Sequence, residues 1–475
     1  MKTATCFNAR AGAALLSLAA GCAHFQPRPL SPPQALDAFG ERTLNRADLG
    51  SYLSTNGVAA SWPLAQWDLP SLTLAAFFYS PELDTARAQL AVSEGELKGA
   101  GERPNPSISA APGYNTTRTA GTVSYWIADV ALSIPIETAG KRGYRVAQAS
   151  HLAKASRLSL AQAAWQVRRE VRASLLEVYA AQEAEAQARR SQALQADASA
   201  LLQKQADAGA IARSELARAR LQEQSSALDV LSARQKQAAA RVRLARAVGV
   251  PAQALADAAL DFDAIRRLPP ALPSAELQRA ALLNRPDLLA SLEAYEASQA
   301  ALQLEVAKQY PDVELGPAYQ YDQGDNKWAL GFTVTLPLFN RNQGAIAAAE
   351  ARRAEAAAAF KALQSRAIGD VEQAQTAYRF ALEKVEAARR LSAGLEQKER
   401  AAQALRAAGE VSRLEVLAER IERASAEQAC LEARLEALQA LGEVEDALQT
   451  PADLPDWSKQ ISAAGAASSE GTNHE

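Results

Sequence analysis

The sequence predicts a mostly α-helical protein with a small amount of membrane-spanning β-sheet, assembled from two similar halves. Three observations predict this class. Two stretches alternate apolar and polar residues over the length of a membrane strand, long stretches of strong helix formers contain no Gly or Pro, and sequence landmarks recur about 200 residues apart. Each half is therefore expected to contain a helix, a β-hairpin, a long helix, a tight turn and a second long helix.

The clearer hairpin lies at about 311–338, where two arms of about 11 residues flank the polar turn 322–327. A tilted strand needs roughly 9 to 11 residues to cross a bilayer. One face of the arms is apolar and aromatic, which suits lipid, and the other is small or polar, which suits a water-filled lumen. An ordinary soluble sheet is the alternative for this stretch taken alone. The expected lipid-facing aromatic residues are Tyr319, Trp328 and Phe332.

The first half contains a matching hairpin at about 106–136, with polar and small linking residues. Its lipid-facing aromatic residues are expected to be Tyr114 and Trp126. Four strands are too few to close a barrel, and open sheet edges would leave backbone groups unpaired in lipid. Oligomerisation is therefore required if the hairpins insert. Three copies would supply twelve strands, within the range known for membrane barrels.

The helical segments are unusually long. Residues 144–208 contain no Gly or Pro and would form a rod of roughly 98 Å at about 1.5 Å per residue. After Gly209 and Gly409, apolar or uncharged residues recur at helical spacing, which predicts coiled-coil seams in both halves. A solitary coiled coil or a solvated Ala-rich helix is the alternative. The seam positions are Leu221, Gln224, Leu228, Leu231, Gln235 and Ala238 in the first half, and Ile421, Ala424, Gln428, Leu431, Leu435 and Leu438 in the second.

Four landmarks in the same order establish the duplication. The first two pairs are offset by 205 residues, the third by 202 and the last by 200. They are Ser80-Pro81 with Arg285-Pro286, Asn105-Pro106 with Tyr310-Pro311, Ile134-Pro135-Ile136 with Leu336-Pro337-Leu338, and Ala208-Gly209 with Ala408-Gly409. The expected boundaries are a signal peptide at 1–21, an N-terminal anchor segment at 22–70, a first repeat at 71–250, a linker at 251–272, a second repeat at 273–450 and a disordered tail at 451–475.

The first residues predict an export signal. Lys2 and Arg10 precede an apolar run that ends at Gly21-Cys22. The small residues before Cys22 resemble a bacterial lipoprotein signal, in which that Cys becomes the lipidated first residue. Cleavage without lipidation is the alternative. Ala23 is not the Asp that retains such lipoproteins at the inner membrane, so the resemblance implies an outer-membrane destination.

Charge and composition argue against several classes of protein. The formal net charge is −3, and it becomes about −5 without the leader, which gives no support for nucleic-acid binding. Apart from Cys6 in the leader and the candidate anchor Cys22, Cys430 is the one remaining Cys. No internal disulfide is therefore expected. The sequence contains no His/Cys cluster, phosphate loop or nucleophile motif. We therefore expect no cofactor, no resident metal and no enzymatic activity.

The two strand ends carry a family resemblance. Residues 134–142 and 336–344, together with the leader and the duplicated halves, resemble the TolC-type outer-membrane efflux proteins. In detail, residues 137–143 and 322–328 resemble the heavy-metal, CzcC-like branch of that family. The resemblance extends from about Leu72 to Leu448. It is specific in these runs and not in the Ala-rich helices.

The resemblance implies a homotrimer whose twelve-stranded β-barrel, with four strands per chain, spans the bacterial outer membrane. A long α-helical coiled-coil barrel would continue it through the periplasm. The chain would meet a periplasmic adaptor and an inner-membrane pump of the resistance-nodulation-division type, and would serve as a passive exit duct for heavy-metal cations. A multidrug or organic-solvent efflux duct is the alternative within this class. A periplasmic coiled-coil adaptor or structural lipoprotein is the alternative from another class.

The resemblance also places functional positions on this sequence. The tight turns are expected at the periplasmic tip, where the adaptor docks, with Gly209, Ile211, Gly409 and Val411 at the contact positions. Glu215 and Glu415, beside Arg213 and Arg413, lie where the family often has gate carboxylates, while a second Asp of the family pattern is replaced by Ala418. The alternatives are helix caps without a contact role and a surface salt bridge worth a few tenths of a kcal/mol.

Overall fold

The computed structural model describes residues 25–58, 62–117, 124–270 and 275–451. The chain divides into two compact units, Met1–Thr43 and Leu44–Glu475. The described part of the first unit contains α2 (Pro32–Gly40). The expected signal peptide, the candidate anchor Cys22 and the tail beyond residue 451 lie outside the described residues.

The second unit contains the same series of elements twice, as the sequence predicts. The first series is α4 (Leu69–Tyr79), α5 (Pro81–Gly101), β1 (Ser107–Tyr114), β2 (Trp126–Ile136), α6 (Lys141–Asp207) and α7 (Arg213–Val248). The second is α9 (Ala275–Leu283), α10 (Pro286–Ala307), β3 (Val313–Asp322), β4 (Asp325–Val334), α11 (Gln343–Ala407) and α12 (Arg413–Leu448). Between α7 and α9 lie η1 (Ala252–Leu255) and α8 (Asp263–Arg266), and α3 (Ala47–Thr55) precedes the first series. The Pro-rich linker is thus not one continuous helix.

The four strands form one antiparallel sheet in the order β1-β2-β3-β4. Tyr114 pairs with Trp126 in the first hairpin, and Tyr319 pairs with Trp328 in the second. Strands β2 and β3, which come from different halves, pair with Val130 opposite Tyr319. The sheet therefore joins the two halves, and β1 and β4 are its edges.

Strand β4 is shorter than the sequence pattern predicts, because Leu336 and Leu338 lie beyond its end at Val334. Their counterparts in the first half, Ile134 and Ile136, belong to β2, where they pair with β3. Among the described residues, no strand pairs with the chain beyond Val334. The predicted turn 322–327 is also tighter than expected, since pairing continues to Asp322 and Asp325.

Glycine is required where β2 meets β3. A Cβ atom on Gly316 would lie 2.1 Å from the carbonyl oxygen of Leu132, which no side chain tolerates without a backbone shift. The next residue, Pro317, has no N–H to donate to the ladder. Gly316 thus permits a close approach of the two strands that join the halves.

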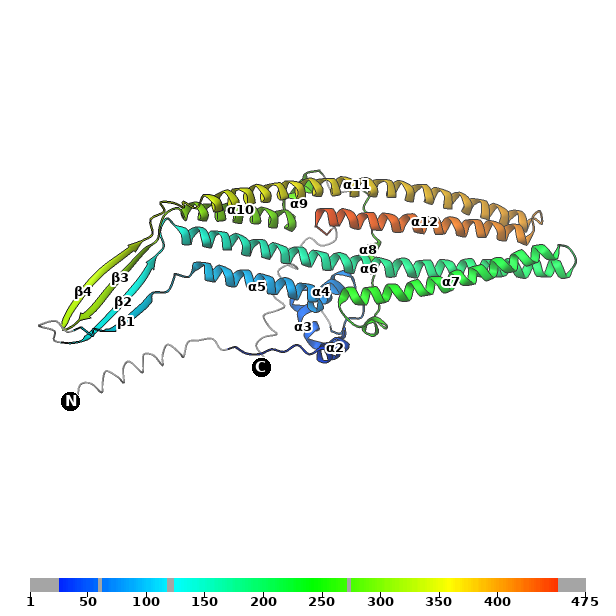
Figure 1. Cartoon of the computed structure of the whole chain (residues 1–475). Helices are drawn as coiled ribbons and strands as arrows, with labels where there is room; N and C mark the ends of the chain where they lie inside the picture. The colour runs from blue at the N-terminus through cyan, green and yellow to red at the C-terminus, as the bar shows by residue number, and fades with distance from the viewer. Residues whose placement is uncertain (1–24, 59–61, 118–123, 271–274, 452–475) are drawn as a thin grey trace. The chain divides into compact units, whose positions relative to one another are not determined.

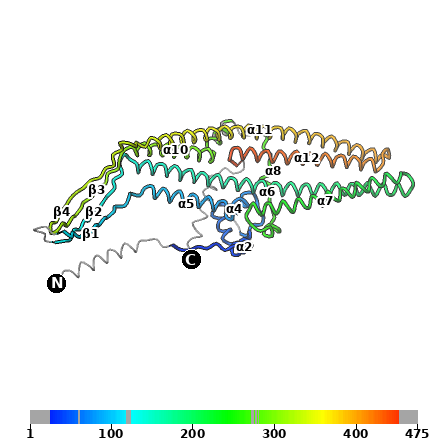
Figure 2. The backbone as a smooth tube through the Cα atoms, viewed as in Figure 1, coloured from blue at the N-terminus to red at the C-terminus, as the bar shows by residue number. Residues whose placement is uncertain are grey.

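The long helix α6 is the centre of the helical part. It packs against α5 and α7 of its own half and against α10 and α12 of the other half. Figure 1 shows the sheet at one end of the long helices and the α6–α7 and α11–α12 turns at the opposite end, and the tube in Figure 2 follows the same path. One continuous helix therefore connects the strands to a turn in each half.

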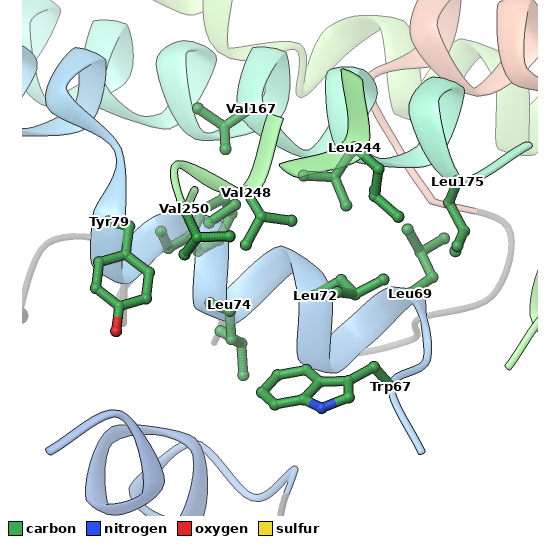
Figure 3. Close-up of a cluster of buried hydrophobic side chains, with 14 of the residues drawn as sticks. Trp67, Leu69, Leu72, Leu74, Tyr79, Val167, Leu175, Leu244, Val248 and Val250 are labelled. Atoms are coloured by element: carbon green, nitrogen blue, oxygen red, sulfur yellow. The ribbon is translucent and has the colours of Figure 1, made fainter. Parts of the chain in front are cut away.

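Two hydrophobic clusters hold the helices together. The larger joins α4, α6, α7 and the residues after α7, and Figure 3 shows Leu72 and Leu74 of α4 beneath Val167, Leu244 and Val248. Fully burying one such Leu or Val contributes about 1.5–3 kcal/mol. The smaller cluster joins α11 to α12 and is rich in Ala, including Ala374, Ala433 and Ala437, which lets these helices approach closely.

The leucines predicted for the seam on α7 do not pack within the single chain. Leu221, Leu228 and Leu231 are exposed in the single chain. The residues of α7 that are buried are Leu216, Ser226, Val230, Ala233, Ala240, Leu244, Ala245 and Val248. This buried stripe mixes large residues with small ones such as Ala233 and Ala240, which allow close helix contact, and the three exposed leucines point away from it. On α12 the predicted Leu438 is buried, together with alanines such as Ala433 and Ala437 and larger residues such as Leu417 and Leu441.

A buried charge cluster ties α6 to α12. Glu445 of α12 lies 3.3 Å from Nη1 of Arg168 and 3.1 Å from Nε of Arg172, and all three side chains are almost fully buried. Gly442 leaves room for the Arg172 guanidinium, because a Cβ there would lie 2.1 Å from Nη1. The cluster therefore fixes how the end of the second half meets the long helix of the first.

Among the described helices, none combines the length and apolar character needed to cross a membrane.

Replacing Gly316 with Ala is expected to destabilise the sheet. The new methyl group would collide with the Leu132 carbonyl, and strain of this kind costs about 1–3 kcal/mol. Gly331→Ala is the matched control, since the nearest atom to its Cβ would be 3.7 Å away. Thermal unfolding of the purified protein should show a lower midpoint for Gly316→Ala and no change for Gly331→Ala. Equal midpoints for the two variants would contradict the proposed close approach.

Candidate functional site

The pairing register separates the sheet into two chemically different faces. Residues directly opposite each other in an antiparallel pair share a face. Val130, Tyr319 and Trp328 are successive partners across β2, β3 and β4, so they lie in one row of the apolar face. The predicted alternation is confirmed. The exposed apolar side chains on this face include Ile108, Tyr114, Trp126, Trp328, Leu330 and Phe332.

The opposite face is polar and carries a negative balance. Asp129, Gln320 and Lys327 form a row on it. Glu314 accepts a hydrogen bond from the Ser133 hydroxyl at 3.0 Å, and Lys327 pairs with Asp322 at 2.6 Å. At the strand positions of this face the acidic residues are Asp129, Glu314, Asp322 and Asp325, and the one basic residue is Lys327. This face would favour water and cations over lipid.

The strand-to-helix junction is locked across the two halves. Lys141, at the start of α6, lies 2.7 Å from Asp312 and also donates to the carbonyl of Tyr310 at 2.6 Å. Thr138 donates its N–H to Asp312 and its hydroxyl to the carbonyl of Pro311. Sequence reasoning used residues 137–143 for the family resemblance and predicted none of these contacts. These contacts show that part of the run connects the end of β2 to the start of β3.

Both predicted tip turns have the same backbone geometry. Gly209 and Gly409 have φ values of 69° and 80°, a conformation that glycine adopts without strain. Ala210 donates its N–H to the carbonyl of Gln205 at 2.8 Å, and Glu410 donates to that of Leu405 at 2.9 Å. These bonds form the same helix-ending motif in each half. Both glycines are exposed, while Ile211 and Val411 are partly buried.

The two turns differ at the start of the following helix. Ser412 caps α12, and its hydroxyl and backbone N–H form a reciprocal capping box with Glu415, both bonds being 3.2 Å. The hydrogen bonds from Ser412 hold the pKa of Glu415 below its ordinary value. In the first half Ala212 stands at the cap position, and it supplies no side-chain bond. Glu415 thus has a structural role that Glu215 lacks.

The predicted arginine partners do not pair with these glutamates within the described chain. Arg213 and Arg413 are exposed, as are Glu215 and Glu415. The ion pairs near the second turn lie further along the helices. There Glu399 of α11 is buried and lies 3.0 Å from both Arg420 and Arg423 of α12. Burial alone would raise the pKa of Glu399, but hydrogen bonds from these two arginines lower it.

A groove of about 750 Å³ lies between α6, α11 and α12. Arg285 at its edge pairs with Asp287 at 2.6 Å. Asp446 lines the groove 3.7 Å from Arg169, and burial raises the pKa of Asp446 to about 6. The lining carries both charge signs, so the groove is a polar seam between helices.

No group of three or more His, Cys, Asp or Glu side chains within the described ranges is arranged to hold a metal ion. His151 forms a pair with Glu293 at 2.6 Å, between α6 and α10. Cys430 is partly buried on α12 beside Leu431. The chemical character of the molecule therefore lies in its two-faced sheet and its two turns.

Comparison with known proteins agrees with this architecture. The family described as "Outer membrane efflux protein" matches residues 69–250 and 277–448, one match for each half. The chain belongs to the outer membrane efflux protein family. Its curated relative, the cobalt-zinc-cadmium resistance protein CzcC of Cupriavidus metallidurans, is 29% identical over 264 residues. That alignment covers 55% of this chain and 61% of the relative, which is less than two thirds of its length.

Solved structures share the fold of this family member. The outer membrane protein VceC of Vibrio cholerae has a TM-score of 0.67 and 20% identity, covering 82% of this chain and 99% of its own. The CmeC outer membrane channel of Campylobacter jejuni has a TM-score of 0.65 and 18% identity, covering 94% and 98%. CusC, described by its transmembrane channel formation, has a TM-score of 0.64 and 18% identity, covering 82% and 94%. The predicted fold class and family resemblance are confirmed.

Removing the charge of Asp446 is expected to stabilise the protein at high pH. A carboxyl group whose pKa is raised from 3.8 to about 6 by burial disfavours its ionised form, so its cost grows as pH rises from 3.8 and is complete above 6. Asp446→Asn should therefore raise stability by up to roughly 3 kcal/mol at pH 8 and have little effect near pH 4.

Thermal unfolding midpoints of the two proteins at both pH values measure this difference. Glu443→Gln, an exposed carboxylate on the same helix and groove, is the control and should change little at either pH. A stabilisation by Asp446→Asn that is equal at both pH values would contradict the role of ionisation.

Proposed function

We propose that this protein is the outer-membrane component of a tripartite efflux system, a passive exit duct formed by three copies of the chain. The observation that carries the proposal is the sheet, with one apolar face, one polar face and two edges unpaired within the chain. A sheet with open edges cannot remain in lipid, where unpaired backbone groups each cost several kcal/mol. Three copies would close twelve strands around the polar faces, with the apolar faces toward lipid.

The helical hairpins would continue this duct into the periplasm. Each strand pair leads directly into α6 or α11, and both helices end at exposed glycine turns. We propose that these turns, with Ile211 and Val411, contact a periplasmic adaptor, which would connect the duct to an inner-membrane pump of the resistance-nodulation-division type. The pump would supply the energy. The duct would perform no chemistry and hold no cofactor.

Heavy-metal cations are the proposed cargo. The curated relative is named for cobalt, zinc and cadmium resistance, and the polar sheet face carries more carboxylates than amines. Carboxylate rings in a narrow passage favour cations. In the proposed trimer Glu215 and Glu415 would form two such rings at the periplasmic mouth, beside Arg213 and Arg413.

Lipidation at Cys22 would anchor the mature chain to the outer membrane, in accord with the leader.

The purified protein is expected to form cation-preferring channels in planar lipid bilayers. Glu215→Gln combined with Glu415→Gln should reduce the preference for cations, because the variant removes six charges from the mouth of a trimer. Glu170→Gln, on an exposed part of α6 away from the turns, is the matched control and should behave as the parent. Channels whose cation preference survives the double change would contradict the gate. Absence of channels in the parent would contradict the duct.

Loss of the protein should sensitise its bacterium to divalent metals. Deletion of the gene is expected to lower growth tolerance of cobalt, zinc and cadmium severalfold, with restoration by the parent sequence. Tolerance of organic solvents and of lipophilic drugs is the matched comparison. Sensitivity to drugs with unchanged metal tolerance would replace the metal assignment with the multidrug one, and would leave the duct itself in place.

A further inference from the structure

Three exposed arginines lie where the sheet meets the helices. Arg103 precedes β1, Arg142 is the second residue of α6, and Arg341 follows the apolar run that ends at Phe339. All three side chains are exposed, and none of them makes an ion pair or a side-chain hydrogen bond with another described residue. Three positive charges are therefore left without a partner in the part of the chain that the structure describes.

Polar contacts hold Arg103 and Arg142 at the same level of the molecule. Arg145 of α6 donates to the carbonyl of Glu102 at 3.1 Å, which brings the stretch before β1 beside the first turns of α6. Arg103 follows Glu102 directly, and Arg142 is about one helical turn before Arg145. Both arginines therefore lie just beyond the strands of the first hairpin.

Arg341 lies at the corresponding place in the second hairpin. The next residue, Asn342, donates to the carbonyl of Glu305 near the end of α10 at 2.9 Å. Lys141 connects the two hairpins at this level through its bond to the carbonyl of Tyr310 at 2.6 Å. The three arginines thus lie around the same end of the sheet.

The carboxylates at this end of the sheet do not neutralise the three arginines. The connecting stretches 100–106, 137–145, 305–312 and 339–345 contain six basic and four acidic residues, a balance of +2 per chain. Three of the four carboxylates already have another basic partner, and the fourth, Glu102, is exposed beside Arg103. The pairs are Glu137–Arg145 at 2.6 Å, Asp312–Lys141 at 2.7 Å and Glu305–Lys308 at 2.6 Å.

The apolar face of the sheet ends at the same level. The exposed side chains of Leu338 and Phe339 follow β4, and Tyr310, which is 61% exposed, stands before β3. Tyrosine is enriched at membrane–water interfaces. A tilted strand of about 9–11 residues spans the hydrocarbon core, so residues just beyond the strands reach the headgroup layer, which is roughly 5–7 Å thick on each side. The exposed arginines would therefore lie among lipid headgroups if the sheet is inserted.

We propose that Arg103, Arg142 and Arg341 bind the phosphate groups of phospholipids in the periplasmic leaflet of the outer membrane. The inference rests on the proposed function, because only insertion of the sheet brings its helix-side end to the headgroups. A guanidinium group binds phosphate through two parallel N–H···O bonds and keeps its charge at physiological pH. The neighbouring side chains of Leu338 and Phe339 would contact the acyl chains of the same lipids. The surface thus fits a ligand that combines a phosphate group with hydrocarbon chains.

These contacts would fix the depth of the sheet in the bilayer. Exposed apolar side chains run along the second hairpin from Trp328 to Leu338, so the apolar face by itself tolerates a small displacement along the membrane normal. A guanidinium group does not tolerate it, because moving its charge into hydrocarbon is costly. The bonds of Lys141 and Arg145 hold the stretches that carry the arginines to the start of α6. The depth of the sheet would therefore also set how far the long helices extend from the membrane.

Titration of the detergent-purified protein with phosphatidylglycerol, followed by native mass spectrometry, measures the contact. Combining Arg103→Gln, Arg142→Gln and Arg341→Gln should lower the affinity about fivefold, the effect of one Arg at an anionic lipid surface. Binding of a diacylglycerol with the same acyl chains, which lacks the phosphate group, should stay as in the parent.

Two further variants separate charge from structure. Lys at the same three positions keeps the charges and should retain most of the affinity for phosphatidylglycerol. The matched control removes three exposed charges from the helices away from the sheet and should bind this lipid as the parent does. Its changes are Arg190→Gln, Arg218→Gln and Arg406→Gln.

An unchanged affinity for phosphatidylglycerol in the Gln variant would overturn the proposal. An equal loss of diacylglycerol binding would overturn it too, since that result indicates damage to the junction and not the loss of a phosphate contact. Displacement of phosphatidylglycerol by an equal concentration of inorganic phosphate would replace the lipid with the free ion as the ligand. Planar-bilayer recordings separate these failures from failure of the duct. Channels formed by the parent protein keep the proposed function whatever the lipid result, and their absence would overturn both.

Discussion

The structure depends on the need to pair every backbone N–H and C=O group of a strand that faces lipid. Within one chain, β2 and β3 meet this need on both sides, whereas β1 and β4 each meet it on one side. The apolar face carries the exposed side chains of Trp328 and Phe332, for which contact with lipid costs little free energy. The side chains therefore permit insertion into a membrane, while the unpaired backbone groups of a single chain oppose it. In the proposed trimer, association of identical copies would resolve the conflict, and the polar faces would enclose water.

Duplication is the simplest way to build such a part. Each half supplies one hairpin and one pair of long helices, and the two are joined at three levels. At the sheet, β2 pairs with β3. At the junction, Lys141 and Thr138 bind Asp312, and further along the helices Glu445 binds Arg168 and Arg172. These contacts make α6 the element against which the second half is positioned.

Sequence reasoning recovered the features that depend on local pattern. The alternation of apolar and polar residues in the hairpins reflects the two faces of a strand, and the glycines at 209 and 409 mark backbone conformations that other residues adopt with strain. It failed where the outcome depends on which neighbours are present. Leu228 and Leu231 are predicted in a coiled-coil seam, but within the single chain they are exposed, and the smaller Ala233 and Ala240 are buried instead. Leu336 fits a strand pattern, but pairing requires a partner strand, and the described part of the chain supplies none at that level.

Some details were present in the sequence as short signals. Ser412 followed by Glu415 is the capping-box pattern, and it marks the start of α12. The contact between Lys141 and Asp312 has no such signal. Asp312 is far from Lys141 along the chain and is brought near only by the pairing of β2 with β3. Long-range polar contacts of this kind follow from the fold and cannot be read before it.

The difference between the cap positions Ser412 and Ala212 affects how many copies of another protein could bind the turns in equivalent surroundings. In a ring of three copies the six turns would alternate, each capped helix start being followed by an uncapped one. A protein that binds these turns would then meet two kinds of binding position, which alternate around the ring. Three identical molecules could all bind at the same kind of turn, in equivalent surroundings. Six identical molecules would form two sets of three, one set at the capped turns and the other at the uncapped turns.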